Sequence, residues 1–335
     1  MDTAAPGLGN APGLTNVAVE DEQRYRRELI AYCYRMLGSA SEAEDAAQET
    51  LVRAWKKGDD FEGRSARRTW LYRIATNVCI DMQRAPQRRA MPMDLTGPST
   101  VSPGAGLAAI GAPLEETVWI EPIHDSRVLP DSGDPAEGAV LRESVRLAFV
   151  AALQHLPPKQ RAVLVLREVL GWSAAEVAEL LESSVDSVTS ALARARSTMA
   201  GIEPSTRGRA LDDGDRSLLD RYVAAFEAYD VQALVALLAE DAVFSMPPYS
   251  FWLRGSEDIE RWYRGPGEVC KGSRMVMTRA NGGPAVAAYH LAGDGRWEPF
   301  ALHLLQVRDG RVAGICHFLD TSSFADFGLP AELTD

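Results

Sequence analysis

The feature that most constrains the fold is a stretch in the middle of the chain, residues 90–135, which contains seven prolines and several glycines. Proline removes a backbone donor and glycine favours irregular backbone, so no helical or strand period continues through this stretch. It is also too long for a loop inside one domain. We therefore expect a flexible linker here, with separate domains on both sides, as the length of 335 residues allows.

The part before the linker has the pattern of a helical domain. Residues 1–20 are rich in Gly, Pro, Ala and Asn and predict a disordered tail, whereas apolar residues recur at helical spacing over residues 21–89. Ser41 with Glu44 three residues later predicts a helix start. We expect three helices here, from Asp21 to Gly38, from Ser41 to Trp55 and from Ala66 to Arg84.

The part after the linker divides into two further domains. Residues 136–200 predict an all-α domain, with one helix through Leu141–Leu153 and three more over 160–169, 174–181 and 186–199. A hydrophilic joint, residues 201–212, follows. Residues 213–335 predict an α+β domain in which three helices pack on a curved antiparallel sheet. We expect the helices at 216–229, 231–238 and 256–263, and the strands at 242–246, 275–279, 285–291, 300–307 and 312–318.

The net charge of -12 argues by itself against a nucleic-acid binder, but the charge is unevenly distributed. Residues 64–89 hold seven arginines and one acid, whereas the linker and residues 201–335 are acidic. Trp70 and Tyr72 lie among the arginines. Arginines interleaved with aromatic rings suit DNA that is being opened, because phosphates are neutralised and unpaired bases stack. The alternative is that Trp70 is a core residue and the arginines form a solvated face.

The last two helices of residues 136–200 have the spacing of a helix-turn-helix. Short polar side chains on the outer face of the second helix suit contact with base edges, and arginines suit contact with phosphate. The residues concerned are Ser187, Thr189, Ser190, Ala191 and Arg194, with Lys159, Arg161 and Arg196 as further phosphate contacts. The alternative is an ordinary helical bundle. Directly before the basic stretch, residues 42–49 are acidic and are either a solvated helix start or a docking face for a basic partner protein.

Several classes of protein are excluded. No apolar run is long enough to span a bilayer, and the N-terminus has no basic region typical of a secretory signal. The four cysteines are far apart and form no zinc or disulfide pattern. We expect a cytoplasmic protein with no membrane contact, no metal and no cofactor.

Four ordered blocks resemble the extracytoplasmic-function (ECF) sigma factors of bacterial RNA polymerase. AEDAAQETLVRAW at residues 43–55 resembles region 2.2, and RTWLYRIATN at 68–77 resembles regions 2.3 to 2.4. LPPKQRAVL at 156–164 and GWSAAEVA at 171–178 resemble regions 4.1 and 4.2. Residues 210–335 resemble a cone-shaped SnoaL-like domain. Two departures stand out: Glu182 occupies a turn position where many members have Gly, and Ala191 one where many have Arg.

The resemblance implies a sigma factor that binds core RNA polymerase, recognises −35 and −10 promoter elements and opens the −10 DNA. It implies polymerase contacts, to the β′ clamp and the β flap, with the β′ contacts at Asp45, Gln48, Glu49 and Arg53. It implies −10 contacts at Arg64, Ser65, Trp70, Arg73, Asn77, Arg84, Arg88 and Arg89. The helix-turn-helix would read the −35 element, and the acidic linker would lie in a basic channel of the polymerase or be a plain spacer.

For the C-terminal domain the sequence leaves three interpretations open. The first is a regulatory module that contacts the sigma core or the linker, the second a ligand sensor, and the third a SnoaL-type isomerase or cyclase attached to a DNA-binding module. Of these we expect the regulatory module and no enzyme. Tyr249 and Trp297 join a candidate pocket in which His303 would form an acid/base pair with Asp320. The other candidate pocket residues are Trp252, Trp262, Tyr289 and His317.

Overall fold

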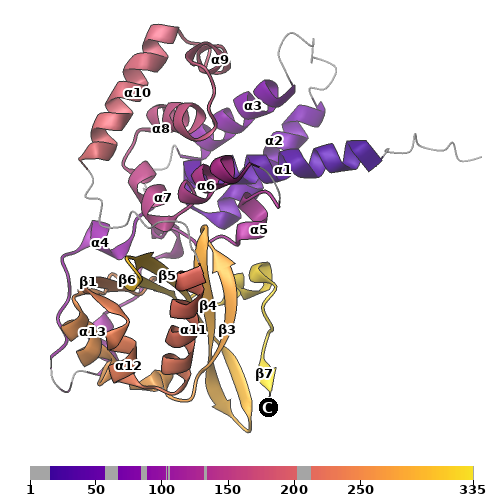
Figure 1. Cartoon of the computed structure of the whole chain (residues 1–335). Coiled ribbons are helices and arrows are strands. Elements are labelled where there is room, and N and C mark those ends of the chain that lie inside the picture. The colour runs from indigo at the N-terminus through magenta and orange to yellow at the C-terminus, as the bar shows by residue number, and fades with distance from the viewer. Residues whose placement is uncertain are drawn as a thin grey trace, which may run out of the picture.

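The computed structural model describes residues 16–56, 67–83, 89–102, 104, 106–131, 134–201 and 213–334. Two helical units lie together on one side of the molecule, and a sheet with its own helices lies on the other (Figure 1). The predicted fold class, two all-α units followed by an α+β unit, is confirmed. The connecting stretch runs between the two sides.

The first unit contains three helices, α1 (Asn16–Leu37), α2 (Ala40–Lys56) and α3 (Arg67–Met82). Gly38, at a φ of +74°, ends α1 in a left-handed conformation that favours glycine. The apolar stripe of α1 is buried against the other two helices, and the Tyr32 hydroxyl lies 2.7 Å from the Thr76 Oγ1 of α3. Helix α1 begins inside the stretch that the sequence predicted as a tail.

The second unit contains more helices than the sequence predicted. They are α6 (Pro135–Glu143), α7 (Leu147–Gln154), α8 (Pro158–Leu164) with a π-helical turn (Val165–Val169), α9 (Ala174–Leu180) and α10 (Val185–Ala200). The single helix predicted through Leu141–Leu153 is wrong, because the chain breaks at Ser144. There the guanidinium of Arg35, which is 1% exposed, donates to the Ser144 hydroxyl over 2.9 and 2.7 Å. A buried guanidinium needs such acceptors.

The expectation of a flexible linker is wrong for the described part of residues 90–135. This stretch forms short helical turns and packs on the rest of the chain because it carries its own apolar residues, among them the buried Trp119, Ile120 and Ile123. Its backbone is also bonded to the C-terminal domain: the Ser99 N–H donates to the Trp252 carbonyl over 2.7 Å. The turns are α4 (Pro92–Leu95), η2 (Leu107–Ile110), η3 (Glu116–Val118) and α5 (Asp125–Val128).

The C-terminal unit is a seven-stranded sheet in the order β2-β1-β6-β5-β4-β3, with β7 paired to β5. The sheet is mixed, because β1 pairs with β6 in parallel, which corrects the expected all-antiparallel sheet. Its helices are α11 (Asp213–Glu227), α12 (Val231–Ala236) and α13 (Ser256–Tyr263), with short turns η5 (Pro266–Cys270) and η6 (Ser322–Phe327). Its strands are β1 (Leu238–Ser245), β2 (Trp252–Arg254), β3 (Arg274–Ala280), β4 (Gly283–Gly293), β5 (Arg296–Arg308), β6 (Arg311–Phe318) and β7 (Leu333–Thr334).

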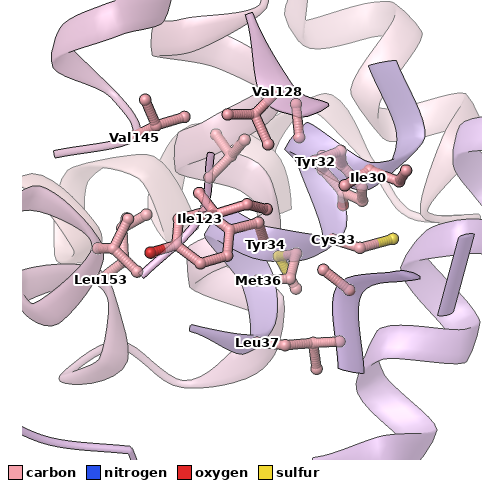
Figure 2. Packing of buried hydrophobic residues seen from close by; sticks show 14 of the residues in the cluster. Ile30, Tyr32, Cys33, Tyr34, Met36, Leu37, Ile123, Val128, Val145 and Leu153 are labelled. Atoms are coloured by element: carbon pink, nitrogen blue, oxygen red, sulfur yellow. The ribbon is translucent and has the colours of Figure 1, made fainter. Parts of the chain in front are cut away.

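The two faces of this sheet contribute to different hydrophobic cores. One face packs with Leu218, Tyr222 and Phe226 of α11 and with the other helices of the C-terminal unit. The opposite face joins a second core that continues through the connecting stretch into both helical units. Figure 2 shows part of this core, where Tyr34 of α1 lies close to Ile123, Val145 and Leu153. The three units therefore share one apolar core.

The turn between β3 and β4 inserts into the junction of all these parts. Asn281, 3% exposed, accepts at Oδ1 from the Ile123 N–H over 3.1 Å and donates from its own N–H to the Ile123 carbonyl over 3.0 Å. Its Nδ2 donates to the Tyr34 hydroxyl (2.6 Å) and to the Val145 carbonyl (2.8 Å). One side chain thus connects α1, the connecting stretch and the second helical unit to the C-terminal sheet.

Gly282 provides a test of this junction. At φ +71°, a Cβ on Gly282 would lie 2.6 Å from the Arg142 carbonyl oxygen, so we expect Gly282→Ala to separate the hairpin from the helical units. The matched control is Gly310→Ala in another hairpin turn, which has the same φ and nothing within 4 Å. Both variants carry the left-handed strain, and Gly282→Ala should lose about 1–3 kcal/mol more, from the clash. Chemical unfolding measures the difference, and equal losses would contradict the close approach.

Candidate promoter and polymerase interfaces

Helix α2 presents the acidic face that the sequence predicted. Asp45, Gln48 and Glu49 are exposed, while Ala43, Ala46, Ala47, Thr50 and Ala54 are buried on the opposite face of the same helix. Arg53 is half-buried, and its Nε donates to the Glu49 Oε1 over 2.7 Å. Such an i,i+4 pair holds both side chains along the helix surface. The four predicted polymerase contacts therefore form one continuous outer face.

The predicted −10 residues of α3 are only partly open to solvent. Asn77 is exposed, and Trp70 and Arg73 are half-buried. Tyr72, which the sequence placed among the aromatic side chains available to DNA, is instead fully buried. The remaining positions of the predicted −10 set, apart from Arg89, lie outside the described residues; these are Arg64, Ser65, Arg84 and Arg88.

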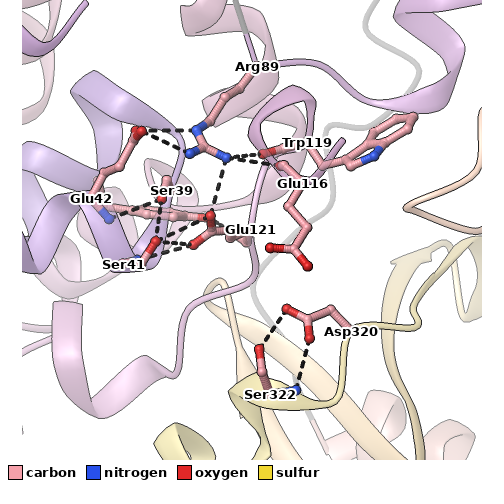
Figure 3. Close-up of polar contacts among 10 residues, drawn as sticks. Ser39, Ser41, Glu42, Arg89, Glu116, Trp119, Glu121, Asp320 and Ser322 are labelled. Carbon is pink, nitrogen blue, oxygen red and sulfur yellow. Dashed lines mark hydrogen bonds and ion pairs between the residues drawn. The ribbon is translucent and has the colours of Figure 1, made fainter. Parts of the chain in front are cut away.

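Arg89 is not available to phosphate in this arrangement. It is 8% exposed and forms ion pairs with Glu42 of α2 (3.0 Å) and Glu121 of the connecting stretch (3.2 Å). Its Nη1 also donates to the Trp119 carbonyl over 2.7 Å, and Glu121 in turn accepts from the Ser41 N–H (Figure 3). A buried guanidinium is stable only with such partners, so Arg89 ties the start of α2 to the connecting stretch.

The second helical unit covers part of the −10 helix. Trp172, in the turn before α9, packs on Tyr72 with ring centroids 5.2 Å apart. The Arg68 guanidinium lies over both rings, 5.4 Å from Tyr72 and 5.7 Å from Trp172. Arg73 lies 3.8 Å from the Glu182 carboxylate. Glu182 has a φ of +49°, so it adopts the left-handed turn in which many family members carry glycine, and its side chain reaches α3.

The helix-turn-helix is well formed. Ser173 caps α9 in a capping box with Glu176, and the Ser184 hydroxyl accepts from the Ser187 N–H at the start of α10. On α10, Val188, Leu192 and Ala195 are buried. Four of the five predicted outer-face residues are exposed, Ser187, Thr189, Ser190 and Arg194, as are Lys159 and Arg196. Ala191, the fifth, is half-buried and packs against the core. Arg196 additionally pairs with Glu168.

Arg161 departs from its predicted contact with phosphate. It is 4% exposed, and its Nη2 donates to the carbonyls of Gln154 (3.2 Å) and Leu156 (3.1 Å). Its Nη1 donates to the Met36 carbonyl at the end of α1. These carbonyls replace the water around the guanidinium, so Arg161 joins the two helical units from the inside.

The structure does not bring the candidate pocket residues together. His303 and His317 stack on neighbouring strands with centroids 3.7 Å apart, on the face of the sheet covered by α11, and Tyr222 bonds the His303 Nδ1 over 3.1 Å. Asp320 is not their partner, because its carboxylate accepts from the Ser322 N–H (2.9 Å) and hydroxyl (2.8 Å). The predicted His303–Asp320 acid/base pair is therefore wrong.

The other candidate pocket residues are distributed over both faces of the sheet. Trp262 packs on Phe244 and Phe251 beside the histidine pair. Tyr289 contacts Phe324 in the core shared with the helical units. Tyr249 and Trp252 lie against the connecting stretch, whereas the Trp297 indole donates to the Gly272 carbonyl.

Comparison with known proteins agrees with this arrangement. Models of sigma-70 region 2, sigma-70 region 4 and the SnoaL-like domain match residues 23–89, 146–199 and 219–315. The chain is 46% identical over 318 residues to the ECF RNA polymerase sigma factor SigG of Mycobacterium tuberculosis, covering 92% of this chain and 83% of that protein. It belongs to the ECF RNA polymerase sigma factors.

Two further comparisons agree with this. The sigma factor is 33% identical over 175 residues to SigW of Bacillus subtilis, which covers 52% of this chain and 82% of SigW. The crystal structure of the M. tuberculosis sigma factor SigJ matches with a TM-score of 0.59 at 24% identity, over 93% of this chain and all of that chain, and shows a shared fold. The predicted family and sigma-factor function are confirmed.

Some residues that shape the interfaces of this sigma factor were missed by the sequence analysis. Asn281 and Gly282 form an Asn-Gly pair between two strands, which signals a hairpin but not the contacts made by its tip. Arg35 sits within an apolar helical stripe, and a lone charge there is a signal of a buried polar contact. Within the described residues, no cluster of three or more His, Cys, Asp or Glu could hold a metal. None of the helices described is long and apolar enough to cross a membrane.

The stacked histidines give the sigma factor a testable pH dependence. Burial lowers the pKa of His317 to about 3, and burial with the neighbouring His317 and His290 lowers the pKa of His303 well below 6.5. Below pH 6.5 the unfolded chain therefore binds protons that the folded chain does not, and the free energy of unfolding should fall with decreasing pH. The expected slope is about 1.4 kcal/mol per pH unit for each histidine.

His317→Phe removes one of these protons and should reduce the slope between pH 6.5 and 5 by about that amount. His155→Gln, which removes an imidazole outside the sheet, is the control. Urea unfolding at several pH values measures the slopes. An unchanged slope in His317→Phe would show that the pair does not stay neutral in the fold.

Proposed function

We propose that this protein is a sigma factor whose free chain is closed and which opens when it joins core RNA polymerase. The observation that carries the proposal is the packing of α3 against the second helical unit through Tyr72, Trp172 and the Arg73–Glu182 pair. Twenty-five base pairs separate positions −35 and −10, which is roughly 85 Å of B-form DNA at 3.4 Å per base pair. Two units that touch cannot read both elements at once.

In the open form, region 2 (residues 23–89) would use the outer face of α2 to bind the polymerase. Asp45, Gln48 and Glu49 remain exposed in the closed chain and Arg53 is half-buried beside them, so the first contact with the β′ clamp needs no rearrangement of α2. Region 4 (residues 146–199) would bind the β flap. The acidic connecting stretch would leave the C-terminal domain for the basic channel of the polymerase only after its contacts with β2 are broken.

The DNA contacts follow from the exposed residues of each unit. On α3, Trp70 and Arg73 would reach the −10 DNA after region 4 moves away, together with Asn77 and the arginines outside the described residues. On the helix-turn-helix, the polar residues of α10 would reach base edges of the −35 element, and Lys159 and Arg196 would reach phosphates. Arg89 and Arg161 would join them only if their buried contacts open.

The C-terminal domain would act as a regulator, and we propose no catalysis for it. The support is that its histidines are enclosed by aromatic rings, with His303 bonded to Tyr222. The domain contacts region 2, the second helical unit and the connecting stretch through the hairpin at Asn281. It would thereby replace a separate anti-sigma protein, and the sigma factor would act in the cytoplasm, where the polymerase is.

Substitution on α3 tests the assignment of the opening surface. We expect Trp70→Ala combined with Arg73→Ala to lower open-complex formation by about tenfold or more, because stacking on unpaired bases and one phosphate contact are lost. Permanganate footprinting of a promoter with reconstituted holoenzyme measures the opening. The same double substitution should leave binding to core polymerase unchanged.

Arg261→Ala and Arg264→Ala on α13 are the matched controls, because they remove exposed, paired arginines from the C-terminal domain. They should leave promoter opening unchanged. Full opening activity in the α3 double variant would show that the −10 DNA is read by another surface. Activity without core polymerase would instead contradict the sigma-factor mechanism.

A further inference from the structure

A cavity of about 110 Å³ lies where region 4, the connecting stretch and the C-terminal sheet meet. In Figure 1 the three elements α4, α7 and the β1–β6 part of the sheet come together at this place. Gln306 and Cys316 line it from the sheet, and because side chains alternate along a strand, His303 and His317 point to the other face. The cavity is therefore separate from the interior enclosed by α11–α13.

The walls of this cavity are mainly apolar and are held in place by other contacts. Leu147 and Ala151 come from α7, Met91 from the residue before α4, and Trp252 from β2. Trp252 is 3% exposed, its indole donates to the Thr96 carbonyl over 2.9 Å, and its strand pairs with β1. Because these walls are already fixed, binding of a ligand requires little further ordering of the protein and loses little conformational entropy.

The lining of the cavity also carries polar and charged side chains, among them Asp94, His155 and Arg254. Asp94 accepts from the Met91 N–H over 2.8 Å and lies 3.3 Å from the His155 Nε2, so its position is fixed. A carboxylate has about four acceptor positions, and these two contacts leave room for a further donor. A ligand group that donates a hydrogen bond suits Asp94, whereas an ionised ring is disfavoured because the mainly apolar walls would strip water from its charge.

The size of the cavity limits the ligand to a single ring. Engineered cavities of about 150 Å³ in protein cores bind benzene, and this cavity is slightly smaller and open at one side. Methionine sulfur and indole walls favour aromatic rings. We propose that this cavity binds a neutral, single-ring aromatic molecule that carries one hydrogen-bond donor, with the ring between α7 and the sheet and the donor at Asp94.

Such a ligand touches three parts of the sigma factor at once. It would strengthen the contact of α7 with the C-terminal sheet and would favour the closed chain over one in which region 4 has moved away. This effect on the chain rests on the proposed function, in which the sigma factor changes from a closed to an open form, whereas binding of the ligand to the cavity does not. The binding and its effect can therefore be tested separately.

Titration of the full chain with phenol tests the binding, with benzoate as an anionic ring and 2-naphthol as a larger one. We expect saturable binding of phenol in heteronuclear NMR, with shifts of the amides of α7 and β6, and affinity at least about tenfold weaker for benzoate. Ala151→Leu fills the cavity and should abolish the phenol-induced shifts. If the Ala151→Leu variant does not fold, Ala148→Leu fills the same cavity and replaces it in the test. Ala139→Leu on the exposed helix α6 is the matched control and should bind phenol as the natural chain does.

The proposal would be overturned by the absence of saturable phenol shifts, by phenol shifts that persist in both cavity-filling variants, or by benzoate binding equal to that of phenol. Equal binding of 2-naphthol would show that the volume does not limit the ligand and would also contradict it. If phenol binds as expected but does not reduce holoenzyme formation, the binding site stands and the closed-chain function fails.

Discussion

The arrangement of the whole molecule depends on the side chain of Asn281. An amide side chain carries two donors and one acceptor, and here each finds a partner on a different segment: the Tyr34 hydroxyl, the Val145 carbonyl and the Ile123 N–H. The site is nearly closed to water, so loss of one partner would leave a buried polar group unpaired at a cost of about 1–3 kcal/mol. Beside it, Gly282 lies so close to the backbone of Arg142 that a Cβ would not fit, so the hairpin tip packs tightly into this junction.

Ion pairs stabilise the same closed arrangement as the Asn281 junction. Inside the folded chain, ion pairs join the parts to one another: Arg89 pairs with Glu121 of the connecting stretch, and Arg127 of that stretch pairs with Glu44 of α2 and Asp326 of the C-terminal domain. The net charge of -12 therefore does not describe the surface that meets DNA. The closed chain pairs Arg89 and Arg127 internally, and we propose that an open chain would expose them to phosphate. We therefore expect the free chain to bind DNA weakly and the holoenzyme to bind it strongly.

The sequence predicted most of what local patterns determine. Helical periodicity predicted the three helices of region 2 and the helix-turn-helix, and the Asp309-Gly310 pair lies in the turn between the last two long strands. Local sequence patterns did not predict the structure where the conformation of one segment depends on its contacts with another. Proline content suggested a free linker at residues 90–135, yet Trp119, Ile120 and Ile123 had the apolar character to pack on the other domains. Arg161 and Arg89 could not be told from phosphate-binding arginines, because the contacts that bury them include partners distant in sequence, the Met36 carbonyl for Arg161 and Glu121 for Arg89.

The central claim is that regions 2 and 4 touch in the free sigma factor and separate in the holoenzyme. The four native cysteines are buried, so dyes can be placed selectively at Trp55→Cys on α2 and Ser197→Cys on α10, both exposed positions. Single-molecule energy transfer between them should be high for the free chain and low once core polymerase and promoter DNA are added. Low transfer in the free chain, or equal transfer in both states, would contradict the account.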